Sequence, residues 1–227
     1  MDARLAGRKA TKRAAMKTAI IGLGNIGSKV AANLAAGGER IIVAERDMAK
    51  AEALAARLGD KVLAMPVEEA VDAADLIVLA ISFDAIKQFL VDHRPGIEGK
   101  ILVDPSNPIA PDGKGGFKKI IPADQSAGQI IAGLVPEGAE LVKAFGTLVA
   151  QSLESGANRS PERAVLFYAT DYPESGRAVA RLITASGFDP VSVGHIDQSI
   201  RIEVFGDLHE AGKLGRLVSA EEARLLV

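Results

Sequence analysis

The sequence contains no cysteine and no tryptophan, and only 4% of its 227 residues are aromatic. The lack of cysteine excludes disulfide bonds, thiolate zinc sites and a cysteine nucleophile. Lysine and arginine number 27 against 29 acidic residues, for a net charge of −2, and this balance, with so few aromatic side chains, disfavours nucleic-acid binding. No apolar run approaches the roughly 20 residues that a membrane-spanning helix needs. We therefore expect a cytoplasmic protein with neither membrane nor nucleic-acid partners.

Residues 1–15 (MDARLAGRKATKRAA) carry five cations and one acid. They lack the apolar centre of a secretory signal. We expect a solvated basic tail ahead of Met16, and the alternatives are an arm that binds nucleotide phosphates or an arginine-rich transit peptide.

Three glycines at GxGxxG spacing interrupt residues 17–28 (KTAIIGLGNIGS), where an apolar run gives way to a helical pattern. The stretch predicts a strand, a tight turn and a helix. In such a turn Gly22 permits the sharp bend, Gly24 lets the backbone approach a pyrophosphate, and Gly27 lets the helix pack closely on the strand. The helix N-terminus, with about half a positive charge, favours an anion there. Similar turns occur in S-adenosylmethionine enzymes, so the surrounding sequence has to decide between these ligands.

Strands and helices alternate along the remainder of the chain. After the first strand, strands are expected at 40–45, 61–65, 75–81, 100–104, 140–145, 164–169 and 191–193, and helices at 28–36, 48–58, 84–91, 125–134 and 175–186. Residues 109–122 predict a long irregular loop, and 154–162 a mobile polar connection. The pattern indicates an α/β fold, a Rossmann-like doubly wound and mostly parallel sheet of about eight strands. We divide it into a dinucleotide-binding domain (16–150) and a C-terminal extension (151–227) that adds strands and ends in short helices.

Ligands of such sheets bind outside the carboxyl ends of the strands, which directs attention to residues 22–27, 45–50, 80–83 and 104–108. Glu45 lies 21 residues after Gly24 at the end of the second strand, where an acid can bind the ribose hydroxyls of NAD. Arg46 follows, and Lys50 lies one helical turn later, so both can approach a 2′-phosphate of NADP. The alternative is that these charged residues form a solvated helix start.

Two further segments belong to this edge. Ala80, Ile81 and Ser82 end the fourth strand on the nicotinamide side of a bound dinucleotide, although Ser82 is also suited to cap the next helix. Asn107 and Pro108 either supply an amide and a rigid wall beside the nicotinamide ring or form a plain turn.

Candidate catalytic groups are few. His93, His195 and His209 show no metal-ligand spacing, so we expect no metal, and no serine lies in a GxSxG elbow. A dehydrogenase of hydroxy acids needs a proton donor or acceptor at the alcohol oxygen, whereas hydride exchange between a nicotinamide and a flavin-like ring needs little help from the protein. The sequence therefore favours a cofactor site without catalytic side chains.

From Met16 the chain resembles the coenzyme F420-dependent NADP oxidoreductase family, whose members often begin M-K-x-A-I-I-G-x-G-N-x-G. Further matching segments are VDPSNPI (103–109), VKAF (142–145) with Thr147, and GFDPV (187–191) with Val193 and Gly194. The resemblance implies a Rossmann domain with a small C-terminal helical part, NADP at the glycine turn and a homodimer.

By position, the resemblance places Gly24, Asn25 and Ile26, within the turn that also contains Leu23, at the pyrophosphate. It places Arg46 and Lys50 at the 2′-phosphate, and Ile81 and Ser82 near the nicotinamide. Two departures are evident: Glu45 replaces the usual Ser or Thr, which leaves NAD possible, and Gly146 replaces an asparagine.

We therefore expect an NADP-dependent oxidoreductase that exchanges hydride with a deazaflavin (F420) or flavin-type acceptor. The alternative is a non-enzymatic NAD(P)-binding sensor or regulatory protein.

Overall fold

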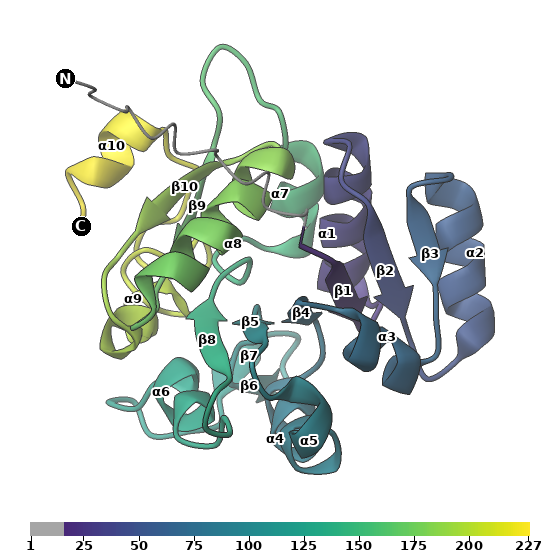
Figure 1. Cartoon of the computed structure of the whole chain (residues 1–227). Helices are drawn as coiled ribbons and strands as arrows, with labels where there is room; N and C mark the ends of the chain where they lie inside the picture. Colours follow the sequence, from purple (N-terminus) through teal and green to yellow (C-terminus); the bar gives the residue numbers. More distant parts are fainter. Residues whose placement is uncertain (1–15) are drawn as a thin grey trace, which may run out of the picture.

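The computed structural model describes residues 16–227, so the expected basic tail at 1–15 lies outside the described residues. Six parallel strands form the central sheet in the order β3-β2-β1-β4-β5-β8 (Figure 1). Their bounds in that order are Val62–Ala64, Ile41–Ala44, Thr18–Ile21, Leu76–Leu79, Ile101–Asp104 and Glu140–Lys143. The order reverses between β1 and β4, which is the topological switch point of a doubly wound sheet.

Alternate residues of each strand bury their side chains on opposite faces of the sheet, as the period of two requires. Ile20 of β1 belongs to one hydrophobic cluster, and its neighbours Ala19 and Ile21 belong to the other. Helices with residues in the first cluster are α1 (Asn25–Ala36), α2 (Met48–Leu58), α7 (Ala150–Ser155) and α8 (Pro173–Ala185). Helices with residues in the second are α3 (Val67–Ala73), α4 (Phe83–Asp92), α5 (Arg94–Ile97) and α6 (Ala127–Ala132). The molecule is thus a three-layer α/β/α sandwich (Figure 1).

A second parallel pair, β9 (Val165–Tyr168) and β10 (Asp189–Ser192), lies beyond β8 and is joined to it by one antiparallel bridge between Lys143 and Ala169. The C-terminal segment continues through η1 (Ile196–Gln198), α9 (Ser199–Ile202) and α10 (Ala220–Arg224), and it closes a third apolar cluster over β9 and β10. The predicted fold class and helical extension are confirmed. The eight predicted parallel strands form two sheets, one of six strands and one of two. Residues on both sides of position 150 share one core, and the division into domains there stays a prediction.

Residues 109–122 are not an irregular loop throughout. They include an antiparallel hairpin of β6 (Ile109–Pro111) and β7 (Phe117–Lys119). Asp112 closes its turn by accepting hydrogen bonds from the backbone N–H groups of Lys114 (2.7 Å) and Gly116 (2.9 Å), which lower the pKa of this exposed carboxyl. The glycines and prolines of this segment favoured the prediction of a loop. In the structure they lie mostly in the turn of the hairpin, where they do not prevent the strands from pairing.

Helix α3 was also absent from the expectation. It spans only seven residues and begins directly after Pro66, with Glu68 and Glu69 in its first turn, where acidic side chains stabilise the helix dipole. Within residues 16–227, none of the helices combines the length and the apolar character needed to cross a membrane.

Candidate functional site

A crevice of about 720 Å³ opens at the carboxyl ends of β1 and β4, at the switch point of the sheet. This volume is in the range of small-molecule and cofactor sites, about 300–1,000 Å³. Its walls come from the glycine turn, the end of β2, the start of α3, and the segment from the end of β4 into α4. The lining residues are Ile21, Gly22, Gly24, Glu45, Arg46, Met48, Pro66, Val67, Glu68, Ala80, Ile81, Ser82, Ala85, Gln88, Phe89, Asp92 and His93.

Each glycine of the turn has a different environment. Gly22 has a φ of +90°, and a Cβ there would lie 2.6 Å from the carbonyl oxygen of Ala80. A Cβ on Gly27 would lie 1.9 Å from the carbonyl oxygen of Gly22, so the helix approaches the turn as closely as backbone allows. A Cβ on Gly24 would have nothing within 4 Å. The first and third glycines therefore build the turn, and the second leaves open space above it.

Helix α1 begins at Asn25 with Gly24 as its N-cap, so no side chain caps its first turn, and that turn contains no acidic residue. Asn25 is exposed, whereas Leu23 and Ile26 are half-buried and pack against the core on this side of the sheet. The positive end of the α1 dipole thus meets the open space at Gly24 without a neutralising group from the helix itself. Such an N-terminus is suited to bind a phosphate.

Glu45 connects the end of β2 to the glycine turn. Its carboxylate accepts hydrogen bonds from the backbone N–H of Leu23 (3.1 Å) and from that of Arg46 (3.0 Å). A carboxylate offers about four lone-pair positions, so both oxygens can still accept a bond from a ribose hydroxyl. Glu45 therefore has a structural role in this turn in addition to any role in binding.

The two cations after β2 differ in position. Arg46 is exposed and lines the crevice. Among the described residues nothing accepts a hydrogen bond from its guanidinium group. Lys50 is not among the lining residues, and its ammonium lies 3.8 Å from the Asp47 carboxylate on the surface of α2. The structure thus brings Arg46 to the site but not Lys50.

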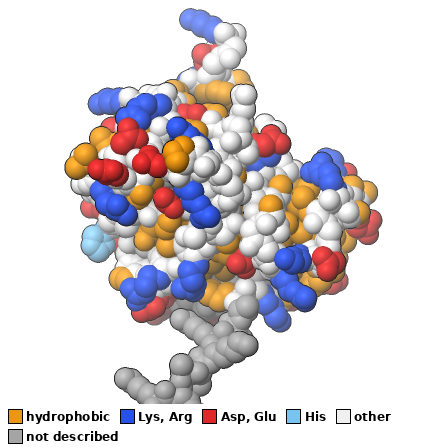
Figure 2. All heavy atoms as spheres, turned by 90° about the horizontal axis from the view of Figure 1, so that it is seen from above, with side chains coloured by type: hydrophobic (Ala, Val, Ile, Leu, Met, Phe, Trp, Pro, Cys, Tyr) orange, Lys and Arg blue, Asp and Glu red, His pale blue; other side chains and the backbone are white. Residues whose placement is uncertain are grey.

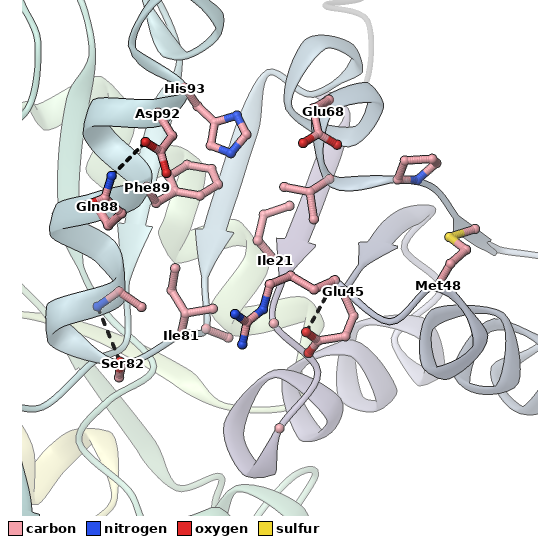
Figure 3. Close-up of a pocket in the computed structure, with 17 residues that line it drawn as sticks. Ile21, Glu45, Met48, Glu68, Ile81, Ser82, Gln88, Phe89, Asp92 and His93 are labelled. Atoms are coloured by element: carbon pink, nitrogen blue, oxygen red, sulfur yellow. Dashed lines mark hydrogen bonds between the residues drawn. The ribbon is translucent and has the colours of Figure 1, made fainter.

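Ala80, Ile81 and Ser82 line the crevice at the end of β4, as expected from their position. Ser82 is the N-cap of α4, and its hydroxyl accepts a hydrogen bond from the backbone N–H of Ala85 at 3.3 Å (Figure 3). The predicted capping role is confirmed, and the hydroxyl is exposed at the crevice while it caps.

One wall of the crevice was missed by sequence reasoning. Pro66 and Val67 follow β3, and Gln88, Phe89 and His93 project from α4 and its C-terminal end (Figure 3). The Phe89 and His93 rings lie 4.4 Å apart between centroids. The signal for Pro66 was available, since it lies at the carboxyl end of a strand. The sequence gives no such signal for the α4 residues, because their position in the crevice wall depends on how the helix packs across the sheet.

Asn107 and Pro108 are not among the lining residues. Pro108 is buried, and the amide of Asn107 is bonded within the protein: Nδ2 donates to the carbonyl oxygen of Gly146 (3.0 Å), and Oδ1 accepts from the backbone N–H of Val204 (2.7 Å). The turn after β5 thereby holds the loop after β8 and the C-terminal segment together.

A buried ion pair supports this turn. Lys143 Nζ lies 2.7 Å from the Asp104 carboxylate and donates to the carbonyl oxygen of Ser106 at 2.6 Å, and both charged side chains are at most 2% exposed. The hydroxyls of Ser106 and Thr147 are buried nearby without a hydrogen-bond partner in the described chain. Lys143 and Asp104 are fully engaged with each other and with backbone, so they fix the loop rather than face the crevice.

Two of the three histidines lie outside the crevice. His209 is buried, and its Nε2 lies 2.9 Å from the Gly146 carbonyl oxygen. His195 is exposed beside Asp171. Within the described part of the chain no group of three or more His, Cys, Asp or Glu residues is arranged to hold a metal ion. On the face shown in Figure 2, cations and acids are interspersed without a large region of one sign.

Comparison with known proteins agrees with this architecture. Residues 17–108 match the family model described as NADP oxidoreductase, coenzyme F420-dependent. A hypothetical protein from Sinorhizobium meliloti is 31% identical with a TM-score of 0.79, over 90% of this chain and 95% of that one.

Two further solved structures share the fold at lower identity. A proposed F420-dependent NADP-reductase from Arthrobacter sp. FB24 is 22% identical with a TM-score of 0.69, over 82% of this chain and 87% of that one. A reductive aminase from Aspergillus terreus, solved with NADPH and ethyl levulinate, is 21% identical with a TM-score of 0.60, over 82% of this chain and 57% of that one.

Proposed function

The chain belongs to the family of coenzyme F420-dependent NADP oxidoreductases, and from that premise we propose that its crevice binds NADP(H) and exchanges hydride with a planar deazaflavin (F420) or flavin-type acceptor. The observation that carries the proposal is the uncapped N-terminus of α1 above Gly24 together with Arg46, which reaches into the same crevice. The N-terminus of α1 supplies a site for a pyrophosphate, and Arg46 supplies a cation for a 2′-phosphate.

The choice between NADP and NAD depends on the pair at the end of β2. Glu45 retains free lone pairs for ribose hydroxyls, which suits NAD. Arg46 has no partner in the described chain and offers a planar, permanently charged fork that suits a phosphate. We propose that NADP is preferred and that Glu45 permits weaker NAD binding, while Lys50, engaged near Asp47, contributes little.

When bound, the nicotinamide supplies the hydride, and the chain's own residues bind and orient the two rings. Of the lining residues at the end of β4, only Ser82 has a polar side chain, and its hydroxyl already caps α4. This end of the crevice therefore offers no residue suited to move a proton on an alcohol oxygen. An acceptor that needs alignment rather than acid–base help fits such a site. Asn107 and Pro108 contribute indirectly, because the turn that they form is bonded to the loop after β8 and to the C-terminal segment.

The proposal is tested by stopped-flow mixing of the NADPH-loaded protein with F420, FMN and FAD separately, followed at the nicotinamide absorbance. Oxidation of NADPH by at least one of the three is the expected result. If none of them oxidises NADPH although the protein binds it tightly, the oxidoreductase assignment fails and the dinucleotide-binding sensor takes its place.

The proposal extends to a homodimer in the cytoplasm, as the resemblance to the family implies. Exposed apolar side chains at the C-terminus, Leu225, Leu226 and Val227, are available to an interface. Sedimentation velocity of the purified chain should give twice the 23.7 kDa monomer mass, and a monomer at all concentrations would remove the dimer from the proposal.

A further inference from the structure

Phe205 is an exposed aromatic residue in a left-handed backbone conformation. Its φ is +74°, and its side chain is 49% exposed. A residue with a Cβ reaches this conformation only at a cost in free energy, which glycine avoids. Strained residues of this kind gather at sites where a side chain has to be presented in one direction.

The backbone around Phe205 is fixed on both sides. The N–H of Val204 donates to Asn107 Oδ1 at 2.7 Å, and the N–H of Gly206 donates to the carbonyl oxygen of Glu203 at 2.8 Å. A Cβ on Gly206 would lie 2.3 Å from the carbonyl oxygen of Arg201. Backbone therefore packs directly on backbone behind Phe205, and the strained φ is imposed by the surroundings.

Glu203 anchors the same segment to helix α6. Its carboxylate is 1% exposed and accepts hydrogen bonds from the backbone N–H groups of Ala127 and Gly128, both at 2.9 Å, at the start of α6. The segment that carries Phe205 is thus held between α6 and the turn after β5.

Phe205 is not among the lining residues of the crevice, but its segment lies at the same carboxyl edge of the sheet. Asn107 follows β5, and β5 pairs with β4, whose carboxyl end carries Ser82 in the crevice wall. Of the seven phenylalanines in the sequence five are buried, and only Phe117 and Phe205 are exposed. About half of this large apolar side chain is left in water, and it belongs to none of the hydrophobic clusters.

We infer that Phe205 is an acceptor-binding residue, an aromatic surface on which a planar tricyclic ring of the flavin or deazaflavin class packs. The inference rests on the proposed function and assigns a binding residue to its planar acceptor, since an aliphatic carbonyl acceptor would gain nothing from such a surface. Stacking on an aromatic side chain is worth about a tenfold change in affinity or more.

The test is a titration of FMN, followed by quenching of its fluorescence, into the NADP⁺-saturated protein. Phe205→Ala should weaken FMN binding about tenfold, and Phe205→Tyr should bind like the wild type, while the affinity for NADPH stays unchanged in both. Phe117→Ala, the matched exposed phenylalanine, should bind FMN normally. Phe205→Gly should weaken FMN binding as much as Phe205→Ala does and yet unfold at a temperature no lower than that of Phe205→Ala, because glycine adopts the positive φ freely.

Three results would overturn the inference. If FMN oxidises the NADPH bound to the wild type but Phe205→Ala binds FMN normally, the role of Phe205 is wrong and the proposed function stands. If Phe205→Ala and Phe205→Gly both unfold at a clearly lower temperature than the wild type and Phe205→Tyr, the side chain is structural. If the wild type binds NADPH but F420, FMN and FAD neither bind to it nor oxidise its NADPH, the inference and the proposed acceptor class both fail.

Discussion

The three glycines of the turn show that one motif can contain positions with different physical demands. Gly22 and Gly27 are required by the fold, because any Cβ there would meet backbone oxygens at 2.6 Å and 1.9 Å. Gly24 has a φ of −71° and open space around it, so the fold itself tolerates a side chain there. The need for glycine at position 24 comes from whatever approaches the N-terminus of α1.

Alanine substitutions separate these demands. Gly27→Ala should lower the free energy of unfolding by about 1–3 kcal/mol, because the added methyl group overpacks a contact between two backbone segments. Gly24→Ala should leave the thermal midpoint nearly unchanged and weaken NADPH binding. Thermal unfolding and an NADPH titration of both variants check this, and a Gly24→Ala variant with full affinity would mean that the phosphate does not approach this turn.

Among the elements, the turn after β5 depends on the ion pair between Asp104, the last residue of β5, and Lys143 of β8. Removing one partner of a buried pair leaves an uncompensated charge, which costs about 3–5 kcal/mol. Lys143→Met should destabilise the protein by that amount in urea unfolding, and the double variant Asp104→Leu with Lys143→Met should recover part of the loss. A single variant as stable as the wild type would show that the pair does not hold the turn.

The loop after β8 carries a pH-dependent contact. Nε2 of His209 is within hydrogen-bond distance of the Gly146 carbonyl oxygen, and Nδ1 accepts from the N–H of Ala211, which is the neutral form of the ring. Burial lowers the pKa of His209 from its ordinary value of 6.5, against smaller opposing effects of the Gly146 carbonyl and Glu210. The folded protein therefore binds fewer protons at this site than the unfolded chain does.

Because the unfolded chain binds more protons at this site, the protein is less stable at low pH. The contribution of His209 is fully present above pH 6.5 and is lost as the pH falls through the lowered pKa of the folded state. The free energy of unfolding, measured in urea at about pH 7.5 and about pH 5.5, should change less between these two pH values for His209→Gln than for the wild type. Equal differences in the two proteins would remove His209 as the cause.

For the whole molecule, sequence reasoning predicted what depends on local pattern. The apolar run at 75–81 became β4, the glycine turn became the floor of the crevice, and the order of alternating elements gave the switch point between β1 and β4. Each of these follows from residue periodicity and turn chemistry, which neighbours in the sequence determine.

What could not be predicted depends on contacts between distant segments. Asn107 was expected beside the nicotinamide, but its amide holds Gly146 and Val204, residues 39 and 97 positions away. Lys50 has the spacing to bind the same phosphate as Arg46, yet it does not line the crevice, and its ammonium lies 3.8 Å from the Asp47 carboxylate. The conformation of Phe205 arises from packing of backbone on backbone, and no single-residue preference indicates it.

The central claim is that this crevice binds NADP(H) through the α1 N-terminus and Arg46. Calorimetric titration of NADPH and NADH into the wild type and Arg46→Ala tests it most directly. A charged hydrogen bond is worth about 1.5–3 kcal/mol, so Arg46→Ala should weaken NADPH binding roughly ten- to a hundredfold and leave NADH nearly unchanged. Equal losses for both cofactors, or no loss for either, would contradict the account.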